Sequence, residues 1–76
     1  PVTLLEKVIL INSVLFLLLT EILNSAIEAV VDRIGMEVHP LAGRAKDMGS
    51  AAVLFALIMG LVAWGFIALP AVFALF

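Results

Sequence analysis

The chain has 76 residues, of which 66% are apolar, and a formal net charge of −2. A soluble domain of this size does not need so apolar a composition, whereas about 20 apolar residues suffice to cross a bilayer as a helix, so we expect a small membrane protein. Cysteine is absent, which excludes disulfides and thiolate metal sites, and the small net charge gives no reason to expect a nucleic acid partner.

The first predicted element is a transmembrane helix over about residues 8–33. Apolar residues dominate from Val8 to Val31, with charged residues on both sides. The acid in its interior, Glu21, costs roughly 3 kcal/mol near the membrane centre, whereas each Leu, Ile, Phe or Val contributes about −0.3 to −0.6 kcal/mol. The segment is therefore expected to insert despite its acid.

A polar loop is predicted next, over about residues 34–42. Three of the four basic residues of the chain lie in or beside it, namely Arg33, Arg44 and Lys46, whereas the outer ends of the predicted spans offer only Lys7. Basic residues favour the cytoplasmic side of a membrane. The loop is therefore expected to be cytoplasmic in a protein that crosses the membrane more than once.

The third element is a second transmembrane helix over about residues 43–70. No charged residue occurs from Met48 to Phe76. Pro70 predicts a kink or the end of the regular helix near the far interface. Trp64 and Phe66 lie toward that interface, which aromatic side chains favour, although contact with lipid explains them equally well. Residues 1–76 thus predict one all-α membrane domain, a transmembrane helical hairpin.

Polar residues form a stripe along the first predicted span. They recur at i, i+3, i+4, i+7 and i+11, which is one face of an α-helix: Glu21, Asn24, Ser25, Glu28 and Asp32. Intramembrane acids usually face a bundle interior or a water-filled cavity and mark proton relays, ion paths or substrate sites. The alternative, that polar groups only join helices, explains Asn24 and Ser25 better than it explains Glu21.

The two glutamates of the stripe differ in predicted depth. Counted from Arg33 at about 1.5 Å per residue, Glu28 lies roughly 7 Å inside the boundary and Glu21 roughly 18 Å. Glu28 can therefore meet a solute from water, and Glu21 one from lipid. Their Cα atoms would be about 10 Å apart, which is too far for both to bind one Mg²⁺ ion comfortably. A metal at Glu28 would need an acid from another helix, and the second span has none.

Two bases lie near the start of the second span. Arg44 and Lys46 sit where free backbone N–H groups and the helix dipole favour anions. Without a Walker motif, membrane topology and contact with lipid headgroups explain them as well. Asp47 could pair with a base or help to order a metal-bound nucleotide, and His39 beside Pro40 is an ordinary loop or helix-capping residue.

Two stretches resemble the signature sequences of the small bacterial diacylglycerol kinases: EILNSAIEAVVD, residues 21–32, and GRAKDMGS, residues 43–50. The resemblance covers about residues 21–53 and includes the connecting DRIG and EVH. It implies an ATP-dependent lipid kinase that transfers the γ-phosphate of ATP to diacylglycerol, giving phosphatidic acid. It further implies Mg²⁺ as cofactor, the bacterial inner membrane, and a homotrimer whose subunits have three spans in a helical bundle.

The same resemblance implies roles for single residues. Glu21 would be the base that accepts the proton of the lipid hydroxyl, and Asn24 would help to orient the site. Glu28 would be the metal ligand near the phosphates of ATP. The resemblance also implies contacts with ATP for Glu37, His39, Lys46 and Asp47. It implies a contact with the lipid for Ser50.

The chain departs from this family at its beginning. Family members carry a surface helix and a first span ahead of the segment seen here, and these contribute nucleotide contacts and another metal-binding Glu. By the resemblance, the two predicted spans would be the second and third, which agrees with a start at Pro1 instead of Met. We therefore expect these 76 residues to be part of a longer chain and to be inactive alone.

Three other functions compete with this one. An undecaprenol kinase of the same family would phosphorylate a polyprenol, although RAKDMGS looks more like the diacylglycerol form. A proton- or cation-conducting oligomeric hairpin would suit an intramembrane Glu equally well, but it leaves Glu28, Lys46 and Asp47 without a role. A purely structural assembly subunit would explain small residues such as Gly60 and Ala63, but not two acids on one face.

Overall fold

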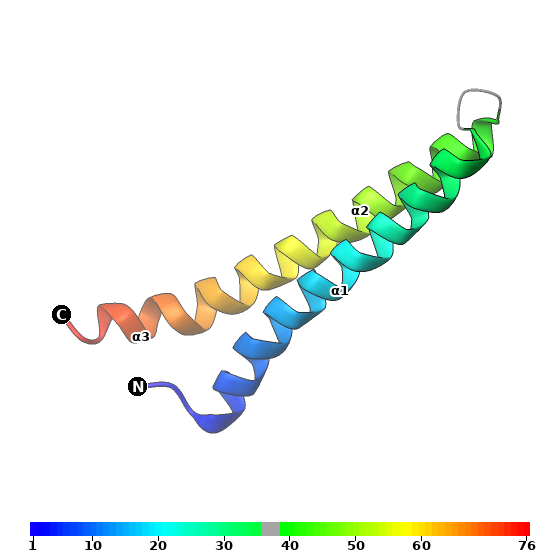
Figure 1. Cartoon of the computed structure of the whole chain (residues 1–76). Coiled ribbons are helices and arrows are strands. Elements are labelled where there is room, and N and C mark those ends of the chain that lie inside the picture. Colours follow the sequence, from blue (N-terminus) through cyan, green and yellow to red (C-terminus); the bar gives the residue numbers. More distant parts are fainter. Residues whose placement is uncertain (36–38) are drawn as a thin grey trace.

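The computed structural model describes residues 1–35 and 39–76 and shows a hairpin of two long helices with both termini at the end opposite the turn (Figure 1). Helix α1 spans Leu4–Ile34. Helix α2 spans Pro40–Ala63 and continues through a π-helical segment, η2 (Trp64–Ala68), into the short helix α3 (Leu69–Phe73). Both arms begin earlier than predicted, since α1 includes residues before position 8 and the first turn of α2 occupies residues 40–42.

Local signals explain both ends of α1. The Thr3 hydroxyl accepts a hydrogen bond from the Glu6 backbone N–H at 3.1 Å, and the Glu6 carboxylate accepts one from the Thr3 N–H at 2.8 Å, which is a capping box. At the other end Gly35 has φ 102°, a conformation that glycine adopts without strain, and its N–H bonds to the Val31 carbonyl at 2.9 Å. The helix therefore stops at the residue before Gly35.

Helix α2 begins at a proline. Pro40 occupies the first turn, where its fixed φ suits a helix and its absent N–H would have had no partner in any case. His39 takes the N-cap position with an extended backbone, and its side chain makes no capping hydrogen bond. The start of α2 is therefore set by the proline ring and not by the histidine side chain.

The far end of the second arm changes helix type at another proline. Pro70 has no N–H to offer to Phe66 four residues earlier, and its ring would crowd that carbonyl. The backbone widens over η2, where the Leu69 N–H bonds to the Trp64 carbonyl, one residue further back than in an α-helix. The regular α-helix of the second arm thus ends at Ala63, and the irregular segment that Pro70 predicted lies in the turns before it.

One seam of each arm faces the other arm. On α1 it consists of Leu10, Ser13, Leu17, Thr20, Asn24, Ile27 and Val31, and on α2 of Ala42, Lys46, Gly49, Val53, Ala56, Gly60 and Ala63, all buried or half-buried. The alternating steps of three and four residues are those of helices packed side by side at a shallow angle. Because the seam of α2 is mostly Gly and Ala, the two backbones can approach closely.

The outer surface of the hairpin is apolar. Large hydrophobic side chains such as Leu19, Phe55 and Leu61 are at least half exposed. The helical stretches Leu4–Ile34 and Pro40–Phe73 have 31 and 34 residues and are long and apolar enough to cross a membrane. The predicted fold class, an all-α membrane protein with a helical hairpin, is confirmed.

Candidate functional site

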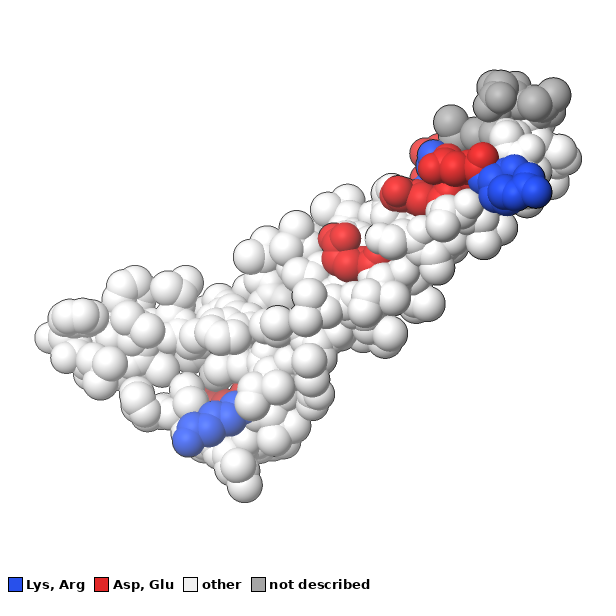
Figure 2. All heavy atoms as spheres, in the orientation of Figure 1, with Lys and Arg blue, Asp and Glu red and all other residues white. Residues whose placement is uncertain are grey.

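Charged side chains gather at the turn end of the hairpin (Figure 2). A separate acidic side chain lies partway along the arm, and a small charged group lies near the N-terminus of α1, while the surface between them is uncharged. The charged residues nearest the turn in sequence are Glu28, Asp32, Arg33, Arg44, Lys46 and Asp47. We call the turn end with these residues the polar end.

A hydrogen bond orients one carboxylate at the polar end. Asn24 Nδ2 donates to Glu28 Oε1 at 2.9 Å, and both side chains are half-buried. Residues four apart lie on the same helix face, so α1 alone brings them together. Because a carboxylate oxygen accepts hydrogen bonds, the amide N–H group fixes the direction of the Glu28 carboxylate.

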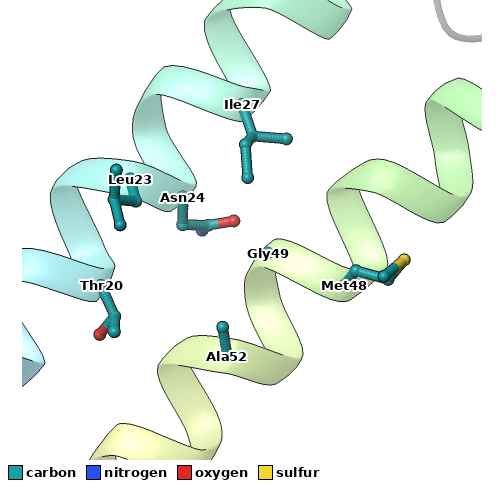
Figure 3. A pocket seen from close by; sticks show the side chains of 7 residues that line it. All are labelled: Thr20, Leu23, Asn24, Ile27, Met48, Gly49 and Ala52. Carbon is teal, nitrogen blue, oxygen red and sulfur yellow. The ribbon is translucent and has the colours of Figure 1, made fainter.

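The other atom of this amide faces the second helix. Asn24 lies opposite Gly49 of α2, in a groove of about 200 Å³ whose other lining residues are mostly apolar (Figure 3). Within the described part of the chain, Asn24 Oδ1 is buried without a hydrogen-bond partner. A Cβ built on Gly49 would overlap Oδ1 and would lie 3.3 Å from Asn24 Cγ and 3.4 Å from Ile27 Cδ1. The helices therefore approach here as closely as a glycine allows.

An ion pair joins the two arms at the polar end. Lys46 Nζ lies 2.8 Å from Asp32 Oδ1, and the side chains are 27% and 64% exposed. The Glu28 carboxylate adds to the negative potential at the same ammonium group. The sequence left Asp47 as a candidate partner for a basic residue, whereas the partner of Lys46 is Asp32. Membership of Asp32 in the polar stripe was the signal that pointed to it.

Helix α2 leaves two residues of the polar stripe uncovered. Glu21 and Ser25 are exposed, because they lie beside the seam and not in it. Helix α2 therefore covers only the part of the stripe that contains Asn24 and Glu28. An acid exposed to hydrocarbon is costly, so we expect another helix or a water-filled cavity on this side of α1.

The remaining predicted site residues lie outside these two contacts. His39, Asp47 and Ser50 are exposed on the surface of the second arm. Glu37 lies outside the described residues. The structure thus forms two polar contacts near the polar end, Asn24 with Glu28 and Lys46 with Asp32. Glu21 lies seven residues from Glu28, toward the middle of α1.

The described residues offer one oriented carboxylate toward a metal ion and not a complete set of ligands. In residues 1–35 and 39–76, no group of three acidic or histidine side chains is placed to hold a metal ion. Glu28 offers a single carboxylate, oriented by Asn24. Since Mg²⁺ is commonly bound by one or two carboxylates together with phosphates and water, this donor set suits a nucleotide-bound Mg²⁺.

A second polar contact ties the arms together far from the polar end. Trp64 Nε1 donates to Ser13 Oγ at 3.0 Å, and the Ser13 hydroxyl donates to the Leu10 carbonyl at 2.7 Å. From the sequence, Trp64 is expected at the membrane interface or against lipid, and nothing in the predicted stripe pointed to Ser13. Its spacing from Thr20 and Asn24, which puts it on the seam, was the available signal.

These features define a class of protein: a membrane helical hairpin with a hydrogen-bonded carboxylate and an ion pair at one end and a further acid partway along the same helix. A sequence profile of the family "Prokaryotic diacylglycerol kinase" matches residues 1–68. The chain belongs to this family. The match extends on both sides of residues 21–53, where the signature stretches lie.

Several bacterial proteins named diacylglycerol kinase are similar to the chain. The protein from Escherichia coli K12 is 66% identical over 58 residues, which cover 76% of this chain and 48% of that relative. The Haemophilus influenzae protein is 54% identical over 63 residues, covering 83% and 53%. The Pseudomonas aeruginosa protein is 52% identical over 64 residues, covering 84% and 52%. The chain thus spans about half the length of the relatives that it matches.

Proposed function

We propose that this chain serves as part of the active site of a lipid kinase that transfers the γ-phosphate of ATP to diacylglycerol and forms phosphatidic acid. The observation that supports it best is the placement of the polar residues. The polar end offers a positively charged side chain, Lys46, and an oriented carboxylate, Glu28, at the membrane edge. Glu21 lies deeper on α1, the helix that also carries Glu28. A water-soluble nucleotide and a membrane-bound lipid could meet along such a stripe.

The nucleotide would bind at the polar end. Lys46 provides a positive charge for the phosphates from the second turn of α2. Asp47 lies beside it, and the resemblance to the family suggests that Glu37 and His39 contact the nucleoside. Glu28 would hold Mg²⁺, which when bound would neutralise phosphate charge.

The lipid would react at Glu21. Its carboxylate accepts the proton of the lipid hydroxyl as that oxygen forms a bond to the γ-phosphorus, and the bond from the γ-phosphorus to the bridging oxygen of ADP breaks. Asn24 keeps its neighbour Glu28 in place while this happens, and Ser50 contacts the lipid. Transfer of this kind depends mainly on positioning and on charge neutralisation.

We infer the membrane arrangement from charge and exposure. Three of the four basic residues lie at the turn end, so we place the turn in the cytoplasm, where ATP is found, and the protein in the bacterial inner membrane. Residues 1–76 would form one membrane domain. The open side of α1, with Glu21 and Ser25, would be covered in a homotrimer of subunits with three spans each.

The test is a transfer assay on membranes that contain the complete reading frame around this chain. ATP labelled at the γ-phosphate is supplied with diacylglycerol, with undecaprenol, or with neither. We expect the label in phosphatidic acid and a requirement for Mg²⁺. Label only in the polyprenol phosphate would make the protein an undecaprenol kinase, and ion conduction without any transfer would make it a conducting hairpin.

A further inference from the structure

Gly49 differs from the other glycines of the second arm. Around Gly43, Gly60 and Gly65 an added Cβ would meet nothing within 4 Å, whereas at Gly49 it would meet Asn24 and Ile27 of the opposite arm. Gly49 is also buried. Its lack of a side chain is therefore needed for space, and the space is taken by Asn24.

The Asn24 amide is held from two sides. Its Nδ2 atom donates to Glu28 Oε1 at 2.9 Å, and its Oδ1 atom lies against Gly49 without a conventional partner. The glycine hydrogen that replaces a Cβ faces this oxygen, and weak Cα–H···O contacts of this kind recur between packed helices. Rotating the amide by half a turn would set two acceptors, Oδ1 and the carboxylate, against each other. The orientation seen is therefore the one that both neighbours favour.

We propose that Gly49 is a positioning residue for Glu28, acting through Asn24. By allowing the α2 backbone to approach, it leaves room for the Asn24 rotamer whose Nδ2 holds the Glu28 carboxylate. This inference rests on the proposed function for what Glu28 does with the nucleotide. The packing itself, from Gly49 through Asn24 to Glu28, stands on the contacts alone.

A methyl group at Gly49 should displace a side chain and leave the fold intact. The overlap is with the end of the Asn24 side chain and not with backbone, so Asn24 can turn away while the helices stay together. Glu28 would then lose its hydrogen bond. Loss of the group that orients a metal ligand typically lowers metal affinity or activity by about 10- to 100-fold.

The experiment compares Gly49→Ala with Gly43→Ala and Gly60→Ala in the complete protein. The two controls add the same methyl group to the same helix, where space is open. We expect Gly49→Ala to raise the Mg²⁺ concentration for half-maximal activity and the KM for Mg·ATP by about 10-fold or more, with a smaller change in kcat. Helix content and thermal unfolding of the three variants should be alike.

A second readout does not depend on catalysis. This chain has two asparagines, Asn12 and Asn24, and no glutamine, so it contributes only two side-chain amide groups to a ¹⁵N spectrum. Gly49→Ala should shift the Asn24 amide signals and leave those of Asn12, while the controls should shift neither. In addition, Gly49→Ala should change the Mg²⁺ dependence no further when Asn24 is already alanine.

The outcomes separate the two claims. Unmoved Asn24 signals in Gly49→Ala, equal effects from all three glycines, or full additivity with Asn24→Ala would overturn the positioning role. Absence of lipid phosphorylation by the unsubstituted protein would instead count against the proposed function, and the amide signals would still decide whether Gly49 positions Asn24.

Discussion

Lys46 Nζ and Asp32 Oδ1 lie 2.8 Å apart and connect the second turn of α2 to the last turn of α1. The pair is too exposed to matter much for stability. Its consequence is positional, because it holds the Lys46 ammonium group against Asp32 of the polar stripe, one helical turn from Glu28. An incoming phosphate would find the ammonium group already in place.

Replacing Asp32 with asparagine should therefore weaken nucleotide binding. Without its partner, Lys46 is free to extend toward anionic headgroups, so we expect the KM for ATP to rise several-fold with little change in kcat. Steady-state kinetics over a range of ATP concentrations would measure this. Glu6→Gln is the matched control, since it removes a remote acid while glutamine can keep the capping box of α1. An unchanged or lower KM in Asp32→Asn would show that Asp32 does not position Lys46.

Glu28→Gln should remove most of the metal dependence of nucleotide binding. The amide keeps the size of the side chain and loses the charge that a hard cation needs. Nucleotide titrations with and without Mg²⁺ should converge in the variant and differ in the unsubstituted protein. If Mg²⁺ strengthens ATP binding equally in both proteins, Glu28 is not a metal ligand.

Trp64→Phe should lower the stability of the hairpin to unfolding and leave nucleotide binding unchanged. The substitution removes the indole hydrogen bond to Ser13, while the Ser13 hydroxyl keeps the Leu10 carbonyl. Hydrogen bonds between helices in membranes are worth about 0.6 kcal/mol on average and up to about 1.7 kcal/mol. Unfolding in detergent should show a destabilisation of that order, with nucleotide affinity preserved.

Phe66→Leu, a change at an exposed aromatic residue of the same segment, is the control. Equal stability of Trp64→Phe and the control would mean that the contact contributes nothing.

Composition and periodicity predicted the hairpin, because hydrophobic length and the polar stripe are properties of single helices. The prediction from Pro70 of where the regular helix is interrupted also depends on the residues of a single segment. So does the prediction from the basic residues of the side on which the loop lies. The early start of α1 was also visible in the sequence, since Thr3 and Glu6 have the spacing of a capping box. Pro40 at the first turn explains in the same way why α2 begins inside the predicted loop.

The contacts between the arms could not be predicted in this way. Whether Lys46 meets Asp32 or Asp47, and whether Asn24 meets Gly49, depends on how far one helix is shifted along the other and rotated against it. A pattern along one helix does not contain that register. The heptad-like spacing of Ser13, Thr20 and Asn24, which the sequence analysis did not use, is a signal for the face of the seam, but it does not tell which residues lie opposite.

The most direct test is phosphate transfer to diacylglycerol by Glu21→Gln in the complete protein at saturating ATP and lipid. A general base contributes about 10²- to 10⁴-fold to a rate and little to the binding of the other substrate. We predict that transfer falls by at least about 100-fold while Mg·ATP affinity is unchanged. Near-normal turnover in Glu21→Gln would contradict the account, because the lipid hydroxyl would then lose its proton without the acid that lies deepest on the stripe.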